Sequence, residues 1–403
     1  MNTSSPFITP RVELTARAEH LAKKARDRDI DVVLIFQNTD LFYFTGTIQK
    51  GVFVLTVESP SESTLFVIRD IQRAKDESTL PNIREMDGMR SLPRILSDMG
   101  IGDDTHIGLE MDVLPAKQYL SVKKMFPNAD ISDASPLIRD VRSVKSPFEI
   151  ELTARAAAMQ RRVFAEAFKF FTPDIREIDI MLRIEARYRE LGHQGLIRMR
   201  GFNQELFYGV VSSGASGDNP NYLDGPVAGA GLYPSFPQGG GTRVIGIHEP
   251  VMVDMVSNVG GYISDAARMY CKGAFPNGAS RALDAAVSAQ EAVLPYMHPG
   301  GSVSAGAEAA RHAADASGLG MRFMGPPGRG VSFVGHGVGL EVDELPVIIE
   351  GTNDTFREGQ IVALEPKFFL EDHGVVGLEN TYVIGPDGPE KLTDFPEEPV
   401  IVD

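Results

Sequence analysis

The sequence has few of the features that mark secreted, membrane-spanning or disulfide-stabilised chains. It contains one cysteine, Cys271, which excludes an intrachain disulfide and is consistent with a reducing compartment, so we expect a cytoplasmic protein. No apolar run approaches the roughly 20 residues that cross a bilayer. The opening residues also lack the basic and then apolar pattern of a signal peptide. We therefore expect neither a membrane partner nor a secretory leader.

The chain also lacks clusters of lysine and arginine. Its formal net charge is -16, and an acidic surface without a basic patch repels the phosphates of nucleic acids. We therefore exclude nucleic acid as a partner. Much of the acidic surface serves solubility, but part of it can bind metal cations.

The length and the hydrophobic content of the chain are sufficient for two domains. The 403 residues are 43% hydrophobic, and at roughly 100–200 residues per domain they predict two domains with a packed core. Short apolar runs alternate with helical patterns in the first part, which predicts an α/β domain over residues 1–145. The expected helices are 11–29 and 93–101, and the expected strands are 31–36, 53–58, 64–68 and 106–111.

The second part, residues 146–403, begins with a strong helix signal. Ser146, Pro147 and Glu149 form a capping box with proline at the first helical position. A second helix is expected near 280–295, although Gln290 interrupts its apolar face. Residues 212–243 are rich in glycine and proline and predict a long loop. Strand-like runs follow, so we expect an α+β domain with helices early and strands late.

Several carboxylates lie within the apolar, strand-like runs of this second part. Asp254, Glu365 and Glu379 are such cases, and burying a lone carboxylate costs several kcal/mol unless it is paired or binds a metal. Asp265 follows Asp254 by eleven residues, and the intervening Gly260-Gly261 allows a hairpin that turns both carboxylates into one site. A shared metal cluster explains all four.

Histidine supplies a fifth candidate ligand. His336 has glycine on both sides, and glycine lets the backbone approach a bound species closely. A packed or solvated histidine is the plainer interpretation of that tripeptide alone. Four carboxylates with one imidazole suit manganese, cobalt, zinc or iron.

The order Asp, Asp, His, Glu, Glu resembles the pita-bread metallopeptidases, which include methionine aminopeptidase, prolidase, Xaa-Pro aminopeptidase and the metal-free creatinase. The matching segments are VDMVSNVGGYISDAAR, GHGVGLEVDELP, ALEPKF and GLENTYVI, with DIDVVLIFQNTDLFYFTG and DVRSVKSPFEIELTARAA in the first half. The resemblance implies a pita-bread catalytic domain over 146–403, preceded by a creatinase-type α/β domain over 1–145. It also implies a homodimer.

The resemblance assigns roles to the five residues. Asp265 and Glu379 would bridge two divalent metal ions, Asp254 would complete the shell of one ion, and His336 and Glu365 that of the other. A hydroxide between the ions would attack a peptide carbonyl. Glu365 would carry a proton toward the leaving amine.

Three positions depart from the proline-specific members of the family. Asn221, followed by Tyr222, stands where a histidine is usual, Asp343 replaces a second histidine, and Gly377 replaces an arginine. We expect Asn221, Tyr222 and Asp343 to contact the substrate, and Asp343 to accept a proton or to bind a cationic group. Asp343 can equally be a solvated or orienting carboxylate. Segment 223–242 is longer than the usual spacing and can line the pocket or form a dimer contact.

The leading functional hypothesis is therefore an Xaa-Pro dipeptidase or aminopeptidase acting on small peptides. The alternative is an amidase or lyase of the same fold acting on a small, cationic metabolite, which Asp343 would favour. A binding protein without catalysis is a third hypothesis, against which the intact ligand set argues.

Overall fold

The computed structural model describes residues 7–402. The first six residues, which form part of the segment behind the signal-peptide expectation, lie outside this range. The chain forms two compact units: one runs to Arg142 and also contains Arg200–Asn203, and the other contains Ser143–Met199 and the residues from Gln204 onward. The boundary predicted after residue 145 stays a prediction. No helix within residues 7–402 is long and apolar enough to cross a membrane.

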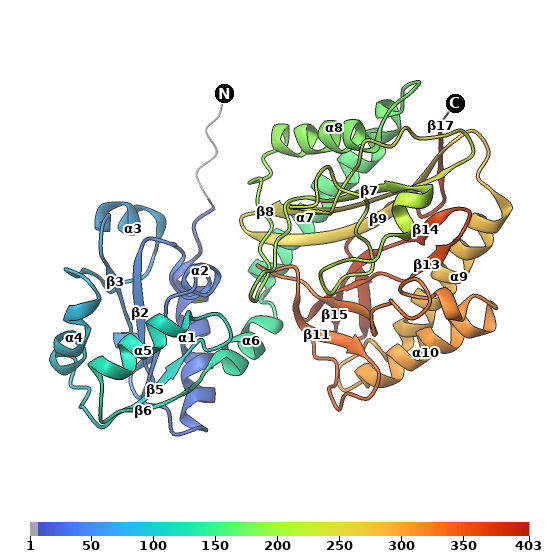
Figure 1. The fold of residues 1–403 in the computed structure, drawn as a ribbon. Helices are drawn as coiled ribbons and strands as arrows, with labels where there is room; N and C mark the ends of the chain where they lie inside the picture. Colours follow the sequence, from blue (N-terminus) through green and yellow to red (C-terminus); the bar gives the residue numbers. More distant parts are fainter. Residues whose placement is uncertain (1–6, 403) are drawn as a thin grey trace. The chain divides into compact units, whose positions relative to one another are not determined.

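The first unit is built on a six-stranded mixed sheet with the order β4-β3-β2-β1-β5-β6 (Figure 1). β2 is antiparallel to both β1 and β3, whereas β5 lies parallel to β1 and to β6. The strands are β1 (Val32–Ile35), β2 (Gly51–Thr56), β3 (Thr64–Val67), β4 (Ile83–Glu85), β5 (His106–Leu109) and β6 (Asp130–Asp133). The helices are α1 (Arg11–Arg26), α2 (Asn38–Thr45), α3 (Ile71–Glu77), α4 (Leu92–Asp98), α5 (Ala116–Met125) and α6 (Ser135–Ser143).

Apolar residues of this sheet are buried beneath helices. Leu34 and Val54 of the central strands belong to one cluster with Leu96 of α4 and Val122 of α5. Leu34 and Val54 lie in the unbroken apolar runs from which the strands were predicted. Such runs are expected because a strand that is covered on both faces buries every side chain. All six elements predicted in this part are found, with ends that differ by a few residues.

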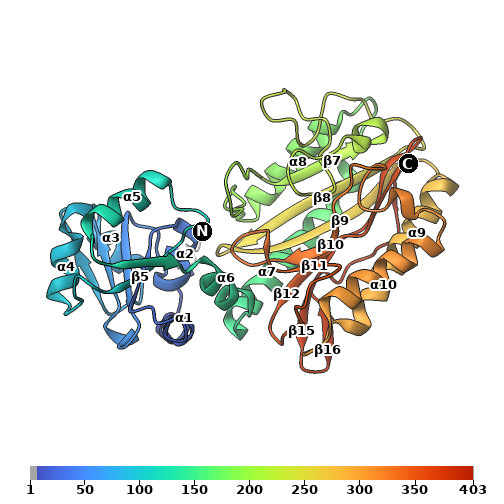
Figure 2. The same ribbon diagram turned by 60° about the horizontal axis from the view of Figure 1, so that its bottom comes forward.

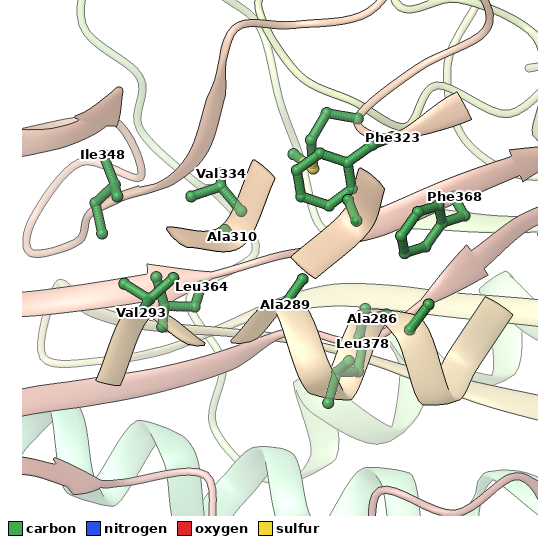
Figure 3. Packing of buried hydrophobic residues seen from close by; sticks show 14 of the residues in the cluster. Ala286, Ala289, Val293, Ala310, Phe323, Val334, Ile348, Leu364, Phe368 and Leu378 are labelled. Atoms are coloured by element: carbon green, nitrogen blue, oxygen red, sulfur yellow. The ribbon is translucent and has the colours of Figure 1, made fainter. Parts of the chain in front are cut away.

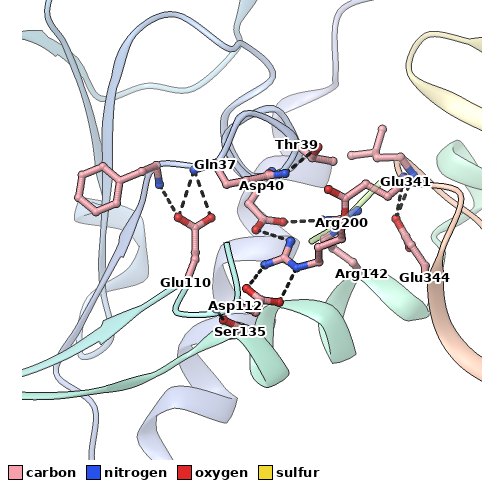
Figure 4. Close-up of polar contacts among 12 residues, drawn as sticks. Gln37, Thr39, Asp40, Glu110, Asp112, Ser135, Arg142, Arg200, Glu341 and Glu344 are labelled. Atoms are coloured by element: carbon pink, nitrogen blue, oxygen red, sulfur yellow. Dashed lines mark hydrogen bonds and ion pairs between the residues drawn. The ribbon is translucent and has the colours of Figure 1, made fainter. Parts of the chain in front are cut away.

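A buried ion network in the first unit connects α2, α6 and the segment Arg200–Asn203. Asp40 accepts from Arg142 at 2.6 Å and from Arg200 at 2.9 Å, and Arg200 also holds Asp112 at 2.7 Å (Figure 4). Glu110 accepts from the backbone N–H of Phe36 at 2.6 Å. The buried Asp40 is therefore compensated by two guanidinium groups, as a charge removed from water requires.

The second unit contains three sheets. Their strand orders are β17-β9-β8-β7, β11-β10-β12-β15-β16 and β13-β14 (Figures 1 and 2). The strands are β7 (Gly209–Ser213), β8 (Pro250–Val259), β9 (Tyr262–Lys272), β10 (Phe333–Gly337), β11 (Glu344–Ile349), β12 (Ile361–Leu364), β13 (Lys367–Leu370), β14 (Gly374–Gly377), β15 (Asn380–Gly385), β16 (Gly388–Lys391) and β17 (Val400–Val402). The helices are α7 (Pro147–Ala167), α8 (Glu177–Glu190), α9 (Asn277–Val293) and α10 (Val303–Ala316).

Two helix pairs cover these sheets. α7 and α8 bury Phe164 and Ile184 against Val253 of β8. α9 and α10 bury Ala286 and Ala310 in a cluster that also contains Leu364 of β12 (Figure 3). Alanine dominates the buried face of α9, and small side chains let a helix approach a sheet closely.

The predicted capping box at the start of α7 is present. Ser146 Oγ accepts from the N–H of Glu149 at 3.3 Å, and Glu149 Oε2 accepts from the N–H of Ser146 at 3.0 Å. Gln290, which interrupts the apolar face expected for the second helix, is buried within α9, and its Oε1 accepts from Asn380 Nδ2 at 3.0 Å. A polar residue on a buried helix face is stable when it is hydrogen-bonded in this way.

Two sequence expectations about this unit were wrong in part. Residues 212 and 213 belong to β7 and residues 214–218 form a 3₁₀ helix, so the loop begins later than residue 212. The helices are not grouped early, because α9 and α10 lie between β9 and β10. The prediction missed α10 because its buried face consists mainly of small side chains, Gly306, Ala307, Ala310 and Ala314, and contains Val303 as its one large apolar residue.

Candidate metal centre

Asp254 and Asp265 lie on one face of the hairpin formed by β8 and β9. Gly260 and Gly261 turn this hairpin with φ values of 61° and 94°, which glycine adopts without strain. Asp254 pairs with Ala267 across the ladder, and Ala267 is two residues from Asp265. Side chains two residues apart on a strand share a face, so the two carboxylates are diagonal neighbours. The hairpin inferred from the two glycines therefore has the geometry that the predicted site needs.

His336 and Glu365 come from a second sheet. His336 of β10 pairs with Ala363 of β12, and Glu365 follows two residues later, just beyond the end of β12. His336 Nε2 lies 3.6 Å from Glu365 Oε1. Sequence analysis placed Glu365 inside a strand. It lies instead at a strand end, and its backbone N–H donates to Val334 at 3.0 Å.

Glu379 joins the two sheets. It lies just before β15 and forms an isolated bridge with Ala267 of β9, in which the Glu379 N–H donates to Ala267 at 3.2 Å. The buried Arg268 donates to the carbonyl of Glu379 at 2.8 Å and to Asn380 Oδ1 at 2.7 Å. Arg268 thus fixes the backbone that presents the Glu379 carboxylate.

Lys367 is a member of the site that sequence analysis missed. Its ammonium lies 2.8 Å from Asp254 Oδ2, 2.7 Å from Glu365 Oε2 and 3.1 Å from Glu379 Oε2. Its side chain is 1% exposed, so these carboxylates are its partners in place of water. The signal was available, because Lys367 follows Glu365 by two residues in a strand-like run.

The cluster is short of positive charge. Burial and the neighbouring charge of Asp254 raise the pKa of Asp265 well above its usual range. Burial and the charge of Asp265 do the same to the pKa of Glu379. Burial lowers the pKa of Lys367, but the charges of Asp254, Glu365 and Glu379 outweigh this effect and hold it well above its usual value. A further cation would stabilise the ionised carboxylates.

The donor atoms fit a divalent metal ion. Asp265, His336 and Glu379 each offer a ligand atom, and these atoms lie within 4.8 Å of one another. Among the residues that the structure describes, buried Asp265 Oδ1 and Glu379 Oε1 have no hydrogen-bond partner. His336 Nδ1 lies 3.2 Å from the carbonyl oxygen of Gly337, an arrangement that places the ring proton on Nδ1 and leaves Nε2 free to coordinate.

Two further residues position the aspartates from behind. Gln160 of α7 donates to the carbonyl of Met255, next to Asp254, and accepts from Ser264 Oγ, next to Asp265, at 2.9 Å. Thr381 Oγ1 accepts from the Asp265 N–H at 3.0 Å and donates to the Asp265 carbonyl at 2.8 Å. Both ligand strands are therefore held by side chains outside the metal cluster.

The three residues predicted to contact the substrate differ in their burial and in their hydrogen bonds. Asn221 Nδ2 donates to Val227 at 2.7 Å and its Oδ1 accepts from Leu223 at 3.0 Å, so the amide holds its own loop. Tyr222 is 47% exposed. Asp343 is half-buried and lies between β10 and β11. The substrate roles of Asn221, Tyr222 and Asp343 stay predictions.

The loop that holds Asp343 is tied to a buried ion pair. Glu344 Oε1 accepts from the backbone N–H groups of Leu340 and Glu341 at 3.0 and 3.3 Å (Figure 4). Glu344 Oε2 pairs with Lys145 at 3.0 Å. This loop is therefore fixed at the carboxyl end of the strand that carries His336.

Segment 223–242 is an ordered loop. Gly229 and Gly239 form a bridge within it, and Phe236 packs on Phe207 with ring centroids 5.6 Å apart. Its far end is held by buried Glu177, which accepts from the Gly241 N–H at 3.1 Å. Whether the loop lines the pocket or forms a dimer contact stays a prediction.

Comparison with known proteins assigns this arrangement to a family. Residues 151–386 match the description metallopeptidase family M24, and residues 17–144 match the creatinase/prolidase N-terminal domain. The chain belongs to metallopeptidase family M24. The predicted pita-bread fold with a creatinase-type amino-terminal domain is confirmed, as is the prediction of a metallopeptidase-type hydrolase.

Relatives of this M24 metallopeptidase align along nearly the whole chain. An Xaa-Pro dipeptidase of Pyrococcus furiosus is 25% identical and covers 95% of this chain and 99% of its own length. The solved Xaa-Pro dipeptidase of Bacillus anthracis has a TM-score of 0.81 at 20% identity, covering 96% and 100% of the two chains. The X-Pro aminopeptidase of Thermotoga maritima has a TM-score of 0.76 at 21% identity, covering 94% and 100%. These structural likenesses show the fold.

Proposed function

We propose that this M24 metallopeptidase hydrolyses the Xaa-Pro bond of small peptides, as a dipeptidase or an aminopeptidase. The observation that carries the proposal is the convergence of Asp265, His336 and Glu379 donor atoms within 4.8 Å, beside Asp254 and Glu365. The names of the relatives, Xaa-Pro dipeptidase and X-Pro aminopeptidase, support the substrate class.

Asp265, His336 and Glu379 would hold the divalent metal on which the family depends, and Asp254 and Glu365 would complete the set. Such an ion supplies Lewis acidity toward the scissile carbonyl and lowers the pKa of water. Carboxylates with one imidazole favour manganese, cobalt, zinc or iron.

The chain's own proton carrier would be Glu365. Its Oε2 is held by Lys367 at 2.7 Å, whereas its Oε1 lies 3.6 Å from His336 Nε2. Glu365 would take one proton from the attacking water and deliver it to the proline nitrogen as the C–N bond breaks. Water is thereby divided between the new carboxyl group and the leaving secondary amine.

A second candidate function rests on Asp343. A half-buried carboxylate close in sequence to His336 would favour a cationic group on the substrate, which suits an amidase or lyase acting on a small metabolite. Within peptidase chemistry, the same residue would alter the preference for the side chain or the amino group of the substrate.

The test is a substrate panel with the Mn(II)- or Co(II)-loaded protein. Xaa-Pro dipeptides, Xaa-Pro tripeptides and dipeptides without proline separate dipeptidase, aminopeptidase and general activity. Glu365→Gln should lower kcat by about 10²–10⁴-fold, since it removes the proton carrier without changing its shape. Glu371→Gln, at an exposed glutamate outside the site, is the matched control and should retain activity. An absence of turnover on every proline peptide, with metal occupancy established, would overturn the proposal.

The homodimer expected from the resemblance is also a proposal. Light scattering coupled to size-exclusion chromatography should give twice the 43.8 kDa mass of the chain. A monomeric mass would contradict it.

A further inference from the structure

Lys367 occupies the part of the centre that the two-ion arrangement would give to one of the ions. In the resemblance, Asp254 serves one ion only, whereas His336 and Glu365 serve the other. Asp254 Oδ2 lies 2.8 Å from the Lys367 ammonium, which also contacts Glu365 Oε2 and Glu379 Oε2. The three contacts are ion pairs at hydrogen-bonding distance around a lysine whose side chain is 1% exposed.

The same carboxylate oxygens cannot serve Lys367 and a second ion. Transition-metal ions bind carboxylate oxygen at about 2.0–2.2 Å, which is closer than an ammonium approaches. An ion on these oxygens would therefore lie against the Lys367 nitrogen, with two positive charges in contact in a buried site. A second ion could bind these oxygens only if the Lys367 ammonium moved away. The backbone of Lys367 is held in the β13–β14 ladder, which limits that movement.

The oxygens that Lys367 leaves free form the set for one ion. Within this cluster, Asp265 Oδ1 and Glu379 Oε1 are buried carboxylate oxygens that have no hydrogen-bond partner in the described part of the chain. His336 offers a ligand atom within 4.8 Å of those of Asp265 and Glu379, and Glu365 Oε1 lies 3.6 Å from His336 Nε2. Two carboxylate oxygens and one imidazole nitrogen make a three-ligand set for one ion, which leaves a coordination position open for water or substrate and leaves Glu365 Oε1 as the proton carrier.

The residue opposite Lys367 leaves space for its stem. Gly377 pairs with Lys367 across the β13–β14 ladder. A Cβ atom at Gly377 would lie 2.4 Å from the carbonyl oxygen of Pro366 and 2.9 Å from Lys367 Cγ. The arginine that the resemblance expects at 377 is thus incompatible with this close pairing. Position 377 therefore lacks the arginine of the resembling family, and Lys367, its cross-strand neighbour, supplies a positive charge instead.

We propose that this centre binds one divalent ion, through Asp265, His336 and Glu379, and that the Lys367 ammonium is the second cation, paired with Asp254. The inference rests on the proposed metal-dependent function and changes its metal content. A fixed ammonium supplies positive charge and hydrogen bonds to the centre, and it cannot be removed by chelation.

The test is the number of Mn(II) ions bound per chain, measured by equilibrium dialysis with elemental analysis. The wild-type protein should bind one ion, and Lys367→Met, which keeps the length of the stem and removes the charge, should bind two. Electron paramagnetic resonance gives an independent reading: isolated Mn(II) shows six lines, and a neighbouring pair shows spin coupling. The coupled spectrum is expected in Lys367→Met and not in the wild-type protein.

Lys24→Met is the matched control. Lys24 is paired with one carboxylate, Asp140, in the first unit and outside the metal cluster. This variant should bind one ion, as the wild type does. Lys367→Gln provides a second variant if Lys367→Met does not fold, and the wild-type stoichiometry needs no variant.

The outcomes separate the inference from the proposed function. Two ions in the wild-type protein, or one ion in both Lys367 variants, would overturn the role of Lys367 and leave the metal-dependent function standing. A wild-type protein that binds none would overturn both.

Discussion

Replacing Gln160 with leucine tests how the two aspartates are held in place. Gln160 makes two buried hydrogen bonds, to the carbonyl of Met255 and from Ser264 Oγ, directly beside Asp254 and Asp265. Leucine keeps the volume and removes both bonds. Each lost bond leaves a buried partner unsatisfied, at a cost of about 1–3 kcal/mol, so unfolding should become easier by about 2–4 kcal/mol. For a unit of this size that corresponds to a fall in Tm of about 5–10 °C.

The same substitution should weaken metal binding. Groups that orient ligands typically change metal affinity by about 10–100-fold when they are removed, so the Kd for Mn(II) should rise in that range. Thermal unfolding by circular dichroism and calorimetric titration with Mn(II) measure the two effects. Gln194→Leu, an identical change at an exposed glutamine whose amide donates to Leu196, is the control and should change neither. Wild-type values of both Tm and Kd in Gln160→Leu would refute the positioning role.

Two further predictions concern Asp343 and His193. Asp343→His should raise kcat/KM on Xaa-Pro dipeptides by at least about tenfold, since it restores a group that can move protons near neutral pH, and equal or lower activity would refute its role in specificity. Burial lowers the pKa of His193 from 6.5 to about 4. Between pH 6.5 and about pH 4, His193 is therefore protonated in the unfolded chain and neutral in the folded chain. The free energy of unfolding decreases as the pH falls through this range. The loss in the free energy of unfolding from pH 7 to pH 5 is on the order of 1 kcal/mol. His193→Phe, which keeps the ring packed on Tyr208 4.6 Å away, should lose less Tm over this range, and an equal loss would contradict the assignment.

The parts of the fold that were predictable are those with strong local signals. The capping box at Ser146 and Glu149 needs four residues, and it begins α7 where expected. The hairpin at Gly260-Gly261 follows from two adjacent glycines between strand-like runs. Both signals lie within a few residues, so no knowledge of the tertiary structure is needed to interpret them.

The remainder depends on contacts between distant segments. Glu365 and Glu379 lie at strand ends, where the register of β12 and β15 decides which way they point. Gln290 was interpreted as a break in an apolar face because its partner, Asn380, is 90 residues away. Asn221 holds its own loop through Leu223 and Val227, which composition alone does not reveal.

Lys367 was overlooked for a related reason. The run ALEPKF was interpreted for its glutamate, and a lysine in an apolar strand is usually a surface residue. Three carboxylates from three different segments compensate its burial. Its spacing from Glu365 is a sequence signal, but its contacts with Asp254 and Glu379 follow only from the assembly of those segments around it.

The most direct test of the metal-dependent hydrolase is turnover of an Xaa-Pro dipeptide before and after metal removal. Protein treated with a chelator and dialysed free of it should show no hydrolysis, and added Mn(II) or Co(II) should restore the activity. The metal-restored Glu365→Gln protein should stay inactive. Full turnover by the metal-free protein, or by Glu365→Gln, would contradict the account.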